Sequence, residues 1–194
     1  MSTRPATAAP GTRDKVLEAA ILLMRRTGFS GAGINEILKE SGAPKGSLYY
    51  FFPQGKKQIV SEALALYTER VLAVFDEAMS KASSPQDKVK RLFQVTAQRL
   101  EESNFQQSCA GGAVSLDLDL ELEAVRLSVV AFFDQTVTLF ARHFPFDDKR
   151  RARAFAGLLL TAIEGGYIRG RAERSSRAFK EAAAWLAELA AQEA

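Results

Sequence analysis

The chain has 194 residues, 47% of them apolar and 25% charged, so it is long enough to bury a core and too apolar to be disordered throughout. Its 26 Lys and Arg against 23 Asp and Glu leave a net charge of +3, which alone neither requires nor excludes a nucleic-acid partner. With a single cysteine, Cys109, and a single histidine, His143, an internal disulfide and a multi-Cys or multi-His metal site are excluded, and we expect a reduced, cytoplasmic setting without a cofactor.

The N-terminal residues are predicted to form a tail and one long helix. Residues 1–11 mix Pro, Thr, Ala and Gly without an apolar period, which is typical of a mobile tail. Thr12 is a candidate cap for a helix whose apolar residues recur at helical spacing up to Gly28. Gly28 is the glycine expected just past a helix end.

Two short helices and a long one follow. The first short helix is predicted over 34–41 and is ended by Gly42. The second is predicted over 45–52, with Pro44 at its first position, where a missing N–H costs nothing. From Lys56 a long amphipathic helix continues towards the Ser-Ser-Pro sequence at 83–85.

The rest of the chain keeps the helical period, and we expect an all-α fold because no strand pattern with turn chemistry is present. The Cys-Ala-Gly-Gly sequence at 109–112 is expected to interrupt the helices. The longest uninterrupted apolar stretch, 154–163, stops at Glu164 and is too short to span a bilayer, so no membrane partner is expected. The remaining helices are predicted over about 86–104, 119–143, 147–172 and 177–191.

The two short helices and their tight turn are the signature of a helix-turn-helix. When the second helix is projected at 100° per residue, Leu48, Phe51 and Phe52 fall on one side and are expected to face the core. The opposite side presents hydrogen-bonding groups and suits the major groove of DNA. It carries Lys45, Gly46, Ser47, Tyr49 and Tyr50.

Each of these residue types has a chemical reason to lie against DNA. Lys45 reaches phosphate or a guanine edge, Gly46 lets the backbone approach the sugar-phosphate chain, and the tyrosines offer hydroxyls and ring area. Positively charged side chains at the starts of the neighbouring helices, Arg13, Lys56 and Lys57, are predicted to clamp the phosphate backbone. Taken singly, the tyrosine pair and the lysine pair are also consistent with plain packing and a solvated surface.

These residues also carry a family resemblance. Thr12-Arg13, Gly28-Phe29 and above all GAPKGSLYYFFPQGKKQ at 42–58 resemble the DNA-binding domain of TetR-family transcriptional repressors. The Cys-Ala-Gly-Gly sequence and residues 162–176 resemble the LmrA/YxaF-like branch. The resemblance implies a homodimer that binds a palindromic operator and is released when a small effector occupies the C-terminal domain. Phe51, where the family commonly has His, and Gly33, where it has Thr or Ser, depart from its pattern.

The expected domain organisation also divides the charge. We predict a tail at 1–11, a helix-turn-helix domain at 12–60 and an effector-binding and dimerisation domain at 61–194. Residues 1–60 hold 9 Lys and Arg against 4 Asp and Glu, a net of +5, and residues 61–194 hold 17 against 19, a net of −2. A basic module on a slightly acidic body is the charge distribution expected of a DNA-binding protein.

Ten of the thirteen phenylalanines follow residue 61, enough to line an apolar effector cavity between helices, although such a stripe is more often core. Cys109 is more simply a buried small hydrophobe than a redox thiol. The candidate effector contacts are Phe75, Phe93, Phe105, Cys109, Phe132, Phe133, Phe140 and Tyr167.

The last two predicted helices are rich in small residues, which permit close helix approach. The resemblance assigns this pair to the dimer interface, and packing within one chain is the alternative. The candidate interface residues are Ala162, Gly165, Gly166, Trp185, Leu186 and Leu189.

The sequence therefore predicts a DNA-binding transcriptional regulator, in particular a repressor released by a small, largely apolar effector, and not an enzyme, because no catalytic triad or metal constellation is present. A helical enzyme or carrier with a scaffolding N-terminus is the alternative of a different class. A DNA-binding protein without an effector is a further alternative, which the sequence does not separate from the first.

Overall fold

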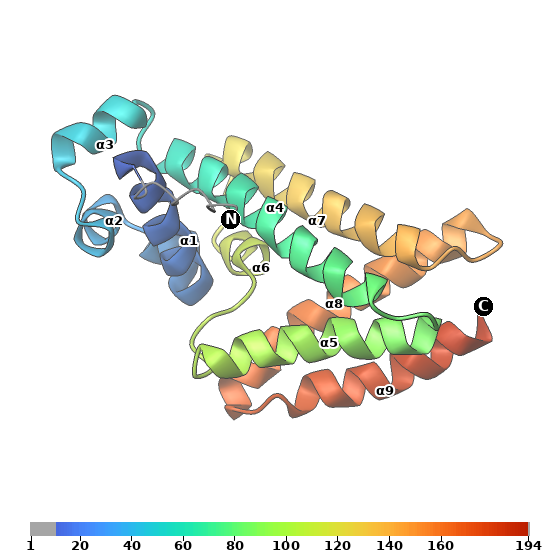
Figure 1. Ribbon diagram of the computed structural model, residues 1–194. Helices are drawn as coiled ribbons and strands as arrows, with labels where there is room; N and C mark the ends of the chain where they lie inside the picture. The colour runs from blue at the N-terminus through green and yellow to red at the C-terminus, as the bar shows by residue number, and fades with distance from the viewer. Residues whose placement is uncertain (1–10, 194) are drawn as a thin grey trace, which may run out of the picture.

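The computed structural model describes residues 11–193, which form nine helices and no strand, so the predicted all-α fold is confirmed. Figure 1 shows three N-terminal helices gathered at one end and the long helices of the C-terminal body running side by side away from them. The predicted mobile tail, apart from Gly11, lies outside the described residues.

The N-terminal helices are α1 (Thr12–Gly31), α2 (Ile34–Ser41) and α3 (Lys45–Phe51). Two predicted caps are wrong by one position. Gly11 is the N-cap of α1 and makes no side-chain cap hydrogen bond, so Thr12 is already helical. Pro44 is the N-cap of α3 and not its first residue, because its ψ of 139° is extended.

Gly28 kinks α1 and does not end it. The residue has φ 68° and ψ −161°, after which one more helical turn runs to Gly31. A Cβ at this position would lie 2.5 Å from Asp117 Oδ2 and 2.9 Å from the carbonyl oxygen of Ala113. Glycine is required here both by the positive φ and by the close approach of the segment that follows residue 112.

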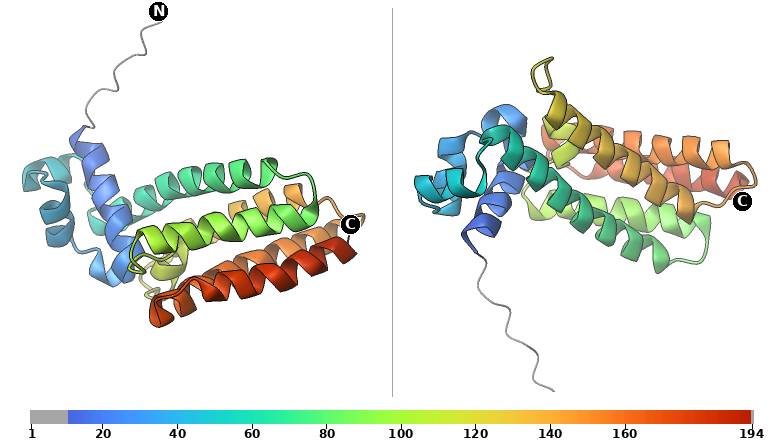
Figure 2. Two further views of the ribbon diagram at one scale, coloured as in Figure 1. Left: turned by 60° about the horizontal axis from the view of Figure 1, so that its bottom comes forward. Right: turned by 90° about the horizontal axis from the view of Figure 1, so that it is seen from above.

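Five long helices form the C-terminal body: α4 (Lys56–Ser80), α5 (Pro85–Glu102), α7 (Glu123–His143), α8 (Lys149–Glu173) and α9 (Arg177–Gln192). Helix α5 packs along α9 and α4, while α7 packs against α4 and α8 (Figure 2). Aromatic pairs fill the spaces between them, with ring centroids 5.6 Å apart for Phe75 and Phe140 and 6.4 Å apart for Phe93 and Phe179. Helix α4 runs without a break across the predicted domain boundary at residue 60.

The Cys-Ala-Gly-Gly sequence was predicted to interrupt the helices, and this prediction is wrong. The sequence begins a short helix, α6 (Ala110–Ser115), with Cys109 as its N-cap. Gly111 and Gly112 are explained by two side chains that pack directly against the α6 backbone. A Cβ on Gly111 would lie 2.2 Å from the Phe132 ring, and one on Gly112 would lie 2.0 Å from Glu164 Oε2. Glycines here mark the close approach of other side chains.

The helix predicted to start at residue 119 starts at Glu123 instead. Residues 116–122 form turns, in which Asp119 Oδ1 accepts a hydrogen bond from the backbone N–H of Glu121 at 2.9 Å. A local side-chain acceptor of this kind competes with the helical hydrogen bonds of the backbone.

Helix α7 is the one described helix that is long and apolar enough to cross a membrane, with a mean window hydropathy of 1.4. The apolar residues of α7 are separated by polar ones, so the search for an uninterrupted apolar stretch did not find this helix. One side of α7 packs on α4 and α8, and Asp134 on the other side pairs with Arg153 of α8. These contacts are those of a helix packed within a helical body.

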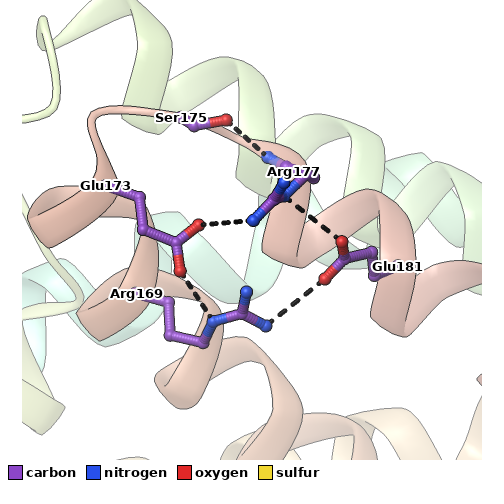
Figure 3. Close-up of polar contacts among 5 residues, drawn as sticks. All are labelled: Arg169, Glu173, Ser175, Arg177 and Glu181. Carbon is purple, nitrogen blue, oxygen red and sulfur yellow. Dashed lines mark hydrogen bonds and ion pairs between the residues drawn. The ribbon is translucent and has the colours of Figure 1, made fainter.

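A ring of alternating charges joins α8 to α9 at their corner (Figure 3). Arg169 contacts Glu173 at 3.0 Å and Glu181 at 3.4 Å, and Arg177 contacts the same two carboxylates at 3.7 and 3.3 Å. Single exposed ion pairs contribute little, but four shared contacts fix the geometry of the corner better than one pair does. The network orients the outer surface that α8 and α9 share.

Candidate nucleic-acid interface and ligand pocket

The turn between α2 and α3 has the geometry of a helix-turn-helix. Gly42 takes the left-handed conformation, with φ 66°, and its N–H donates to Leu38 O at 3.0 Å. The N–H of Ala43 then donates to Ser41 Oγ at 3.2 Å, and the small Ala43 side chain is buried. Three residues therefore reverse the chain steeply and leave α3 across the end of the module.

The inner side of α3 was predicted correctly at two positions and wrongly at one. Leu48 and Phe52 are fully buried, but Phe51 is 36% exposed and its ring meets that of Tyr50 with centroids 5.1 Å apart. The reason is that α3 ends at Phe51. Phe52 leaves the helix with φ −130° and ψ 71° and turns its ring into the core position.

The outer side of α3 brings together the predicted DNA contacts. Lys45, Gly46, Tyr49 and Tyr50 are exposed, with Tyr50 reaching 81%, and Ser47 is half-buried. Residues 42–57 contain no Asp or Glu. The surface offers one cation, three hydroxyls and two exposed aromatic rings besides Phe51, at the end of the molecule remote from α9 (Figure 1).

The three predicted phosphate clamps are engaged within the protein. Arg13 contacts Glu62 at 2.5 Å and lies over the Phe52 ring, and Lys57 Nζ donates to Glu121 O at 2.8 Å. Lys56 Nζ lies 4.1 Å from the centroid of the Phe29 ring and 3.4 Å from Ser30 O. Burial lowers the pKa of Lys56, opposed by the nearby Asp117. Their contacts with DNA stay a prediction.

A large open pocket of about 1020 Å³ lies between the end of α1, the 104–108 segment, α6, α7 and α8. Of the eight predicted ligand contacts, Phe105 and Phe133 line it. Phe93 lines a separate hollow of about 530 Å³ beside α9. The other predicted contacts, which are Phe75, Cys109, Phe132, Phe140 and Tyr167, are buried side chains outside the lining.

Much of the pocket lining is polar, which the sequence analysis did not anticipate. Arg26, Asp117, Glu164 and Arg171 line it together with Phe105 and Phe133. Burial raises the pKa of Glu164 to about 7, partly opposed by a hydrogen bond with the Cys109 thiol. Burial and the nearby Glu164 raise the pKa of Cys109 well above its usual range, which agrees with a buried thiol and not with a reactive one.

One wall of the pocket is the end of α1, which belongs to the helix-turn-helix module. Asp117 Oδ2 accepts a hydrogen bond from the N–H of Ser30 at 2.8 Å. Ser108 exchanges two hydrogen bonds with Arg25, from Ser108 N to Arg25 O at 2.7 Å and from Arg25 Nε to Ser108 O at 3.0 Å. The pocket lining and the module therefore share structural elements directly.

The predicted dimer residues divide into two groups. Gly166 and Leu186 are buried within the chain, and a Cβ on Gly166 would lie 2.5 Å from the Phe179 ring, so these two pack α8 on α9. Trp185 is 76% exposed, while Ala162, Gly165 and Leu189 are half-buried. Three exposed residues of α8 were not predicted, although their spacing was a signal: Leu158, Thr161 and Ile168 lie on one stripe with the predicted Gly165.

A steep turn between two short helices, an exposed cationic and aromatic α3, and a helical body with a pocket define a helix-turn-helix, DNA-binding regulator. The family comparisons agree. Residues 16–63 match the model "Bacterial regulatory proteins, tetR family", and residues 85–185 match "Transcriptional regulator LmrA/YxaF-like, C-terminal domain". The chain belongs to the tetR family of transcriptional regulators, of the LmrA/YxaF-like kind, and not to an enzyme family.

Individual relatives cover most of the chain. The HTH-type transcriptional regulator YxaF of Bacillus subtilis is 30% identical over 81% of this chain and 83% of its own length. Regulatory protein TetR from Rhodobacter sphaeroides has the same fold, with a TM-score of 0.80 over 91% of this chain and 97% of that one at 17% identity. A cysteine mutant of the regulator CifR, solved with a 26-base-pair double-strand operator, gives 0.79 over 96% and 98% at 19% identity.

Proposed function

We propose that this chain is a cytoplasmic repressor that binds a palindromic operator as a homodimer and is released by a small effector. The proposal keeps the predicted domains, in which residues 12–60 bind DNA and residues 61–194 bind the effector and the second protomer. The observation that carries the proposal is the exposed surface of α3, which bears Lys45, Tyr49 and Tyr50 and no carboxylate. The DNA-bound structure of CifR supports it, because that chain has the same fold.

Binding is proposed to place α3 of each protomer in the major groove. Lys45 and the tyrosine hydroxyls then reach phosphates and base edges, and the rings of Tyr50 and Phe51 offer apolar contact to thymine methyl groups. Arg13 and Lys57 lie at helix starts beside this surface. Their present partners are the half-buried Glu62 carboxylate and the carbonyl oxygen of the exposed Glu121, and we propose that phosphate replaces both.

We propose that the effector causes release of DNA by acting on the end of α1, which forms one wall of the pocket. A ligand that displaces Asp117 or Ser108 would change how Ser30 and Arg25 are held, and with them the orientation of α1. Effector and operator would then weaken each other reciprocally, typically by about 1–3 kcal/mol.

The proposed function is tested by selecting DNA fragments from the source genome with the purified protein. We expect recovered fragments to share a palindromic site, and binding to weaken at least about a hundredfold between about 50 and 200 mM salt, because several phosphate contacts release counterions. Sites without two-fold symmetry, or affinity that is flat with salt, would contradict the proposal. DNA binding that no ligand weakens would instead favour a regulator without an effector.

The homodimer is proposed to form through the outer surface of α8 and α9. Leu158, Gly165 and Ile168 present a stripe with open space above Gly165, and Ile168 is 61% exposed. Arg169 contacts Glu181 across the corner, so α9 continues the same surface, and Trp185 lies one turn beyond Glu181. Two such surfaces would form a four-helix interface.

We expect the variant Trp185→Glu to be largely monomeric. A buried interface tryptophan commonly contributes about 2 kcal/mol or more, and the two-fold axis doubles the loss. Sedimentation equilibrium over a range of concentrations measures the change. Leu127→Glu, which replaces another exposed apolar side chain on α7, is the matched control and should leave the assembly unchanged. Equal dimerisation of wild type and Trp185→Glu would place the interface elsewhere.

A further inference from the structure

Glu164 holds an oxygen that lacks a hydrogen-bond partner inside the protein. The residue lies on α8 and lines the large pocket, and its Oε1 is buried and unpaired among the described residues. An unpaired buried acceptor costs free energy that a paired one does not. A carboxyl group that lines a pocket and is short of hydrogen-bond partners is explained if a ligand in the pocket supplies a donor to it.

The surroundings hold this carboxyl group in place. Its other oxygen, Oε2, packs so closely on Gly112 that a Cβ there would lie 2.0 Å away. The buried groups around it come from three helices: Cys109 at the start of α6, Tyr67 of α4 and Tyr167 of α8. The glycine makes room for the carboxyl group, which is therefore accommodated by the α6 backbone.

The charges of the lining indicate which donor the site accepts. Arg26, Arg171 and Arg174 line the pocket, and its second carboxylate, Asp117, already accepts from Ser30 N. Three guanidinium groups disfavour a cationic ligand. Phe105, Phe133 and Ile168 supply apolar surface for the body of the molecule.

We propose that Glu164 anchors the ligand of this pocket and selects a molecule that presents an uncharged hydrogen-bond donor, a hydroxyl or an amide N–H, to its carboxyl group. A hydroxyl suits either protonation state of the carboxyl group, because it donates to the ionised form and accepts from the neutral one. The inference rests on the proposed function only in calling this ligand the effector, and binding to the pocket is measurable without DNA.

The test uses three probes with the same number of heavy atoms: benzyl alcohol, ethylbenzene and benzylamine. Each is titrated into the full chain at pH 7.0 and followed by chemical-shift changes of the protein. Hydration differs between probes, so the measured quantity is the change that a substitution causes for each one. We expect Glu164→Leu to weaken benzyl alcohol about tenfold relative to ethylbenzene, because one hydrogen bond is lost.

Three further variants make the outcome specific. Glu164→Gln keeps an acceptor oxygen and should retain benzyl alcohol binding to within about threefold. Gly112→Ala displaces the carboxyl group without removing it and should reduce the preference for the alcohol even if Glu164→Leu does not fold. Glu69→Leu, at an exposed position of α4 away from the pocket and from the proposed dimer surface, should change nothing. An alcohol-to-ethylbenzene affinity ratio that is the same in wild type, Glu164→Leu and Gly112→Ala overturns the proposal. So does a Glu164→Leu substitution that weakens benzylamine more than it weakens benzyl alcohol.

A separate measurement distinguishes the pocket inference from the proposed repressor function. Operator fragments bound by the wild type are challenged with benzyl alcohol in a mobility-shift assay. Glu164-dependent binding of the alcohol without release of DNA supports the anchoring role and counts against the effector function. Release of DNA by ethylbenzene and benzyl alcohol alike, in wild type and Glu164→Leu, supports the effector function and overturns the anchoring role.

Discussion

Replacing Lys45 and Tyr49 together with alanine is expected to abolish operator binding while the protein stays folded. Both side chains project from α3 into solvent and contribute little to the core. Each contact with DNA typically contributes about 1–3 kcal/mol, and a homodimer loses two contacts per protomer, so affinity should fall at least about a thousandfold. Fluorescence anisotropy with a labelled operator measures the loss.

The matched control is Lys39→Ala, which removes an exposed lysine from the neighbouring α2 and leaves α3 intact. Its affinity should stay within a few fold of the wild type, and the thermal unfolding temperatures of all three proteins should agree. Operator binding by the double variant at wild-type strength would mean that α3 is not the recognition helix.

Replacing Glu164 with glutamine is expected to change how stability depends on pH. Burial raises the pKa of Glu164 to about 7, whereas in the unfolded chain the carboxyl titrates near about 4.3. The folded protein therefore binds more protons between these values, and its free energy of unfolding falls as pH rises through this window, by up to about 4 kcal/mol from this group. Above about pH 7 the carboxyl group is ionised in the folded protein, and the free-energy cost of burying its charge is present in full.

Urea unfolding of wild type and Glu164→Gln at fixed protein concentration, from about pH 4.5 to pH 8, measures this difference. The variant should gain stability relative to the wild type as pH rises, because other titrating groups are common to both. Glu69→Gln, an exposed control on α4, should track the wild type. Parallel curves for wild type and Glu164→Gln would show that the carboxyl group is hydrated and ordinary.

The helix-turn-helix surface could be predicted from the sequence because its residues lie on one short helix. Lys45, Tyr49 and Leu48 are separated by a few positions, so their faces follow from the 3.6-residue period alone. Phe51 was misplaced because the period holds only while the helix continues. The helix ends there, and the next residue, Phe52, fills the core.

The pocket could not be predicted in the same way because its lining comes from segments distant in the chain. Thr27, Phe105, Ala113 and Phe133 meet only after the helices have packed. The phenylalanines predicted as ligand contacts belong mostly to the core. Phe75 and Phe140, for example, pack against each other. Glu164 did leave a signal, because it is the first charged residue after ten uncharged positions on one helix.

Helix α4 is unbroken and directly connects the helix-turn-helix end of the molecule to the far end of the C-terminal body. Its 25 residues make a rod about 37 Å long at 1.5 Å per residue, with Lys56 and Lys57 at the end beside the recognition helix. At the far end Asp76 contacts His143 of α7 at 2.7 Å. A tilt of about 5° at that end would carry the lysines by about 3 Å, close to the 3.4 Å spacing of successive base pairs. If α4 tilts as one rod, a small change in packing at the far end would become a misfit of about one base-pair step at a bound operator.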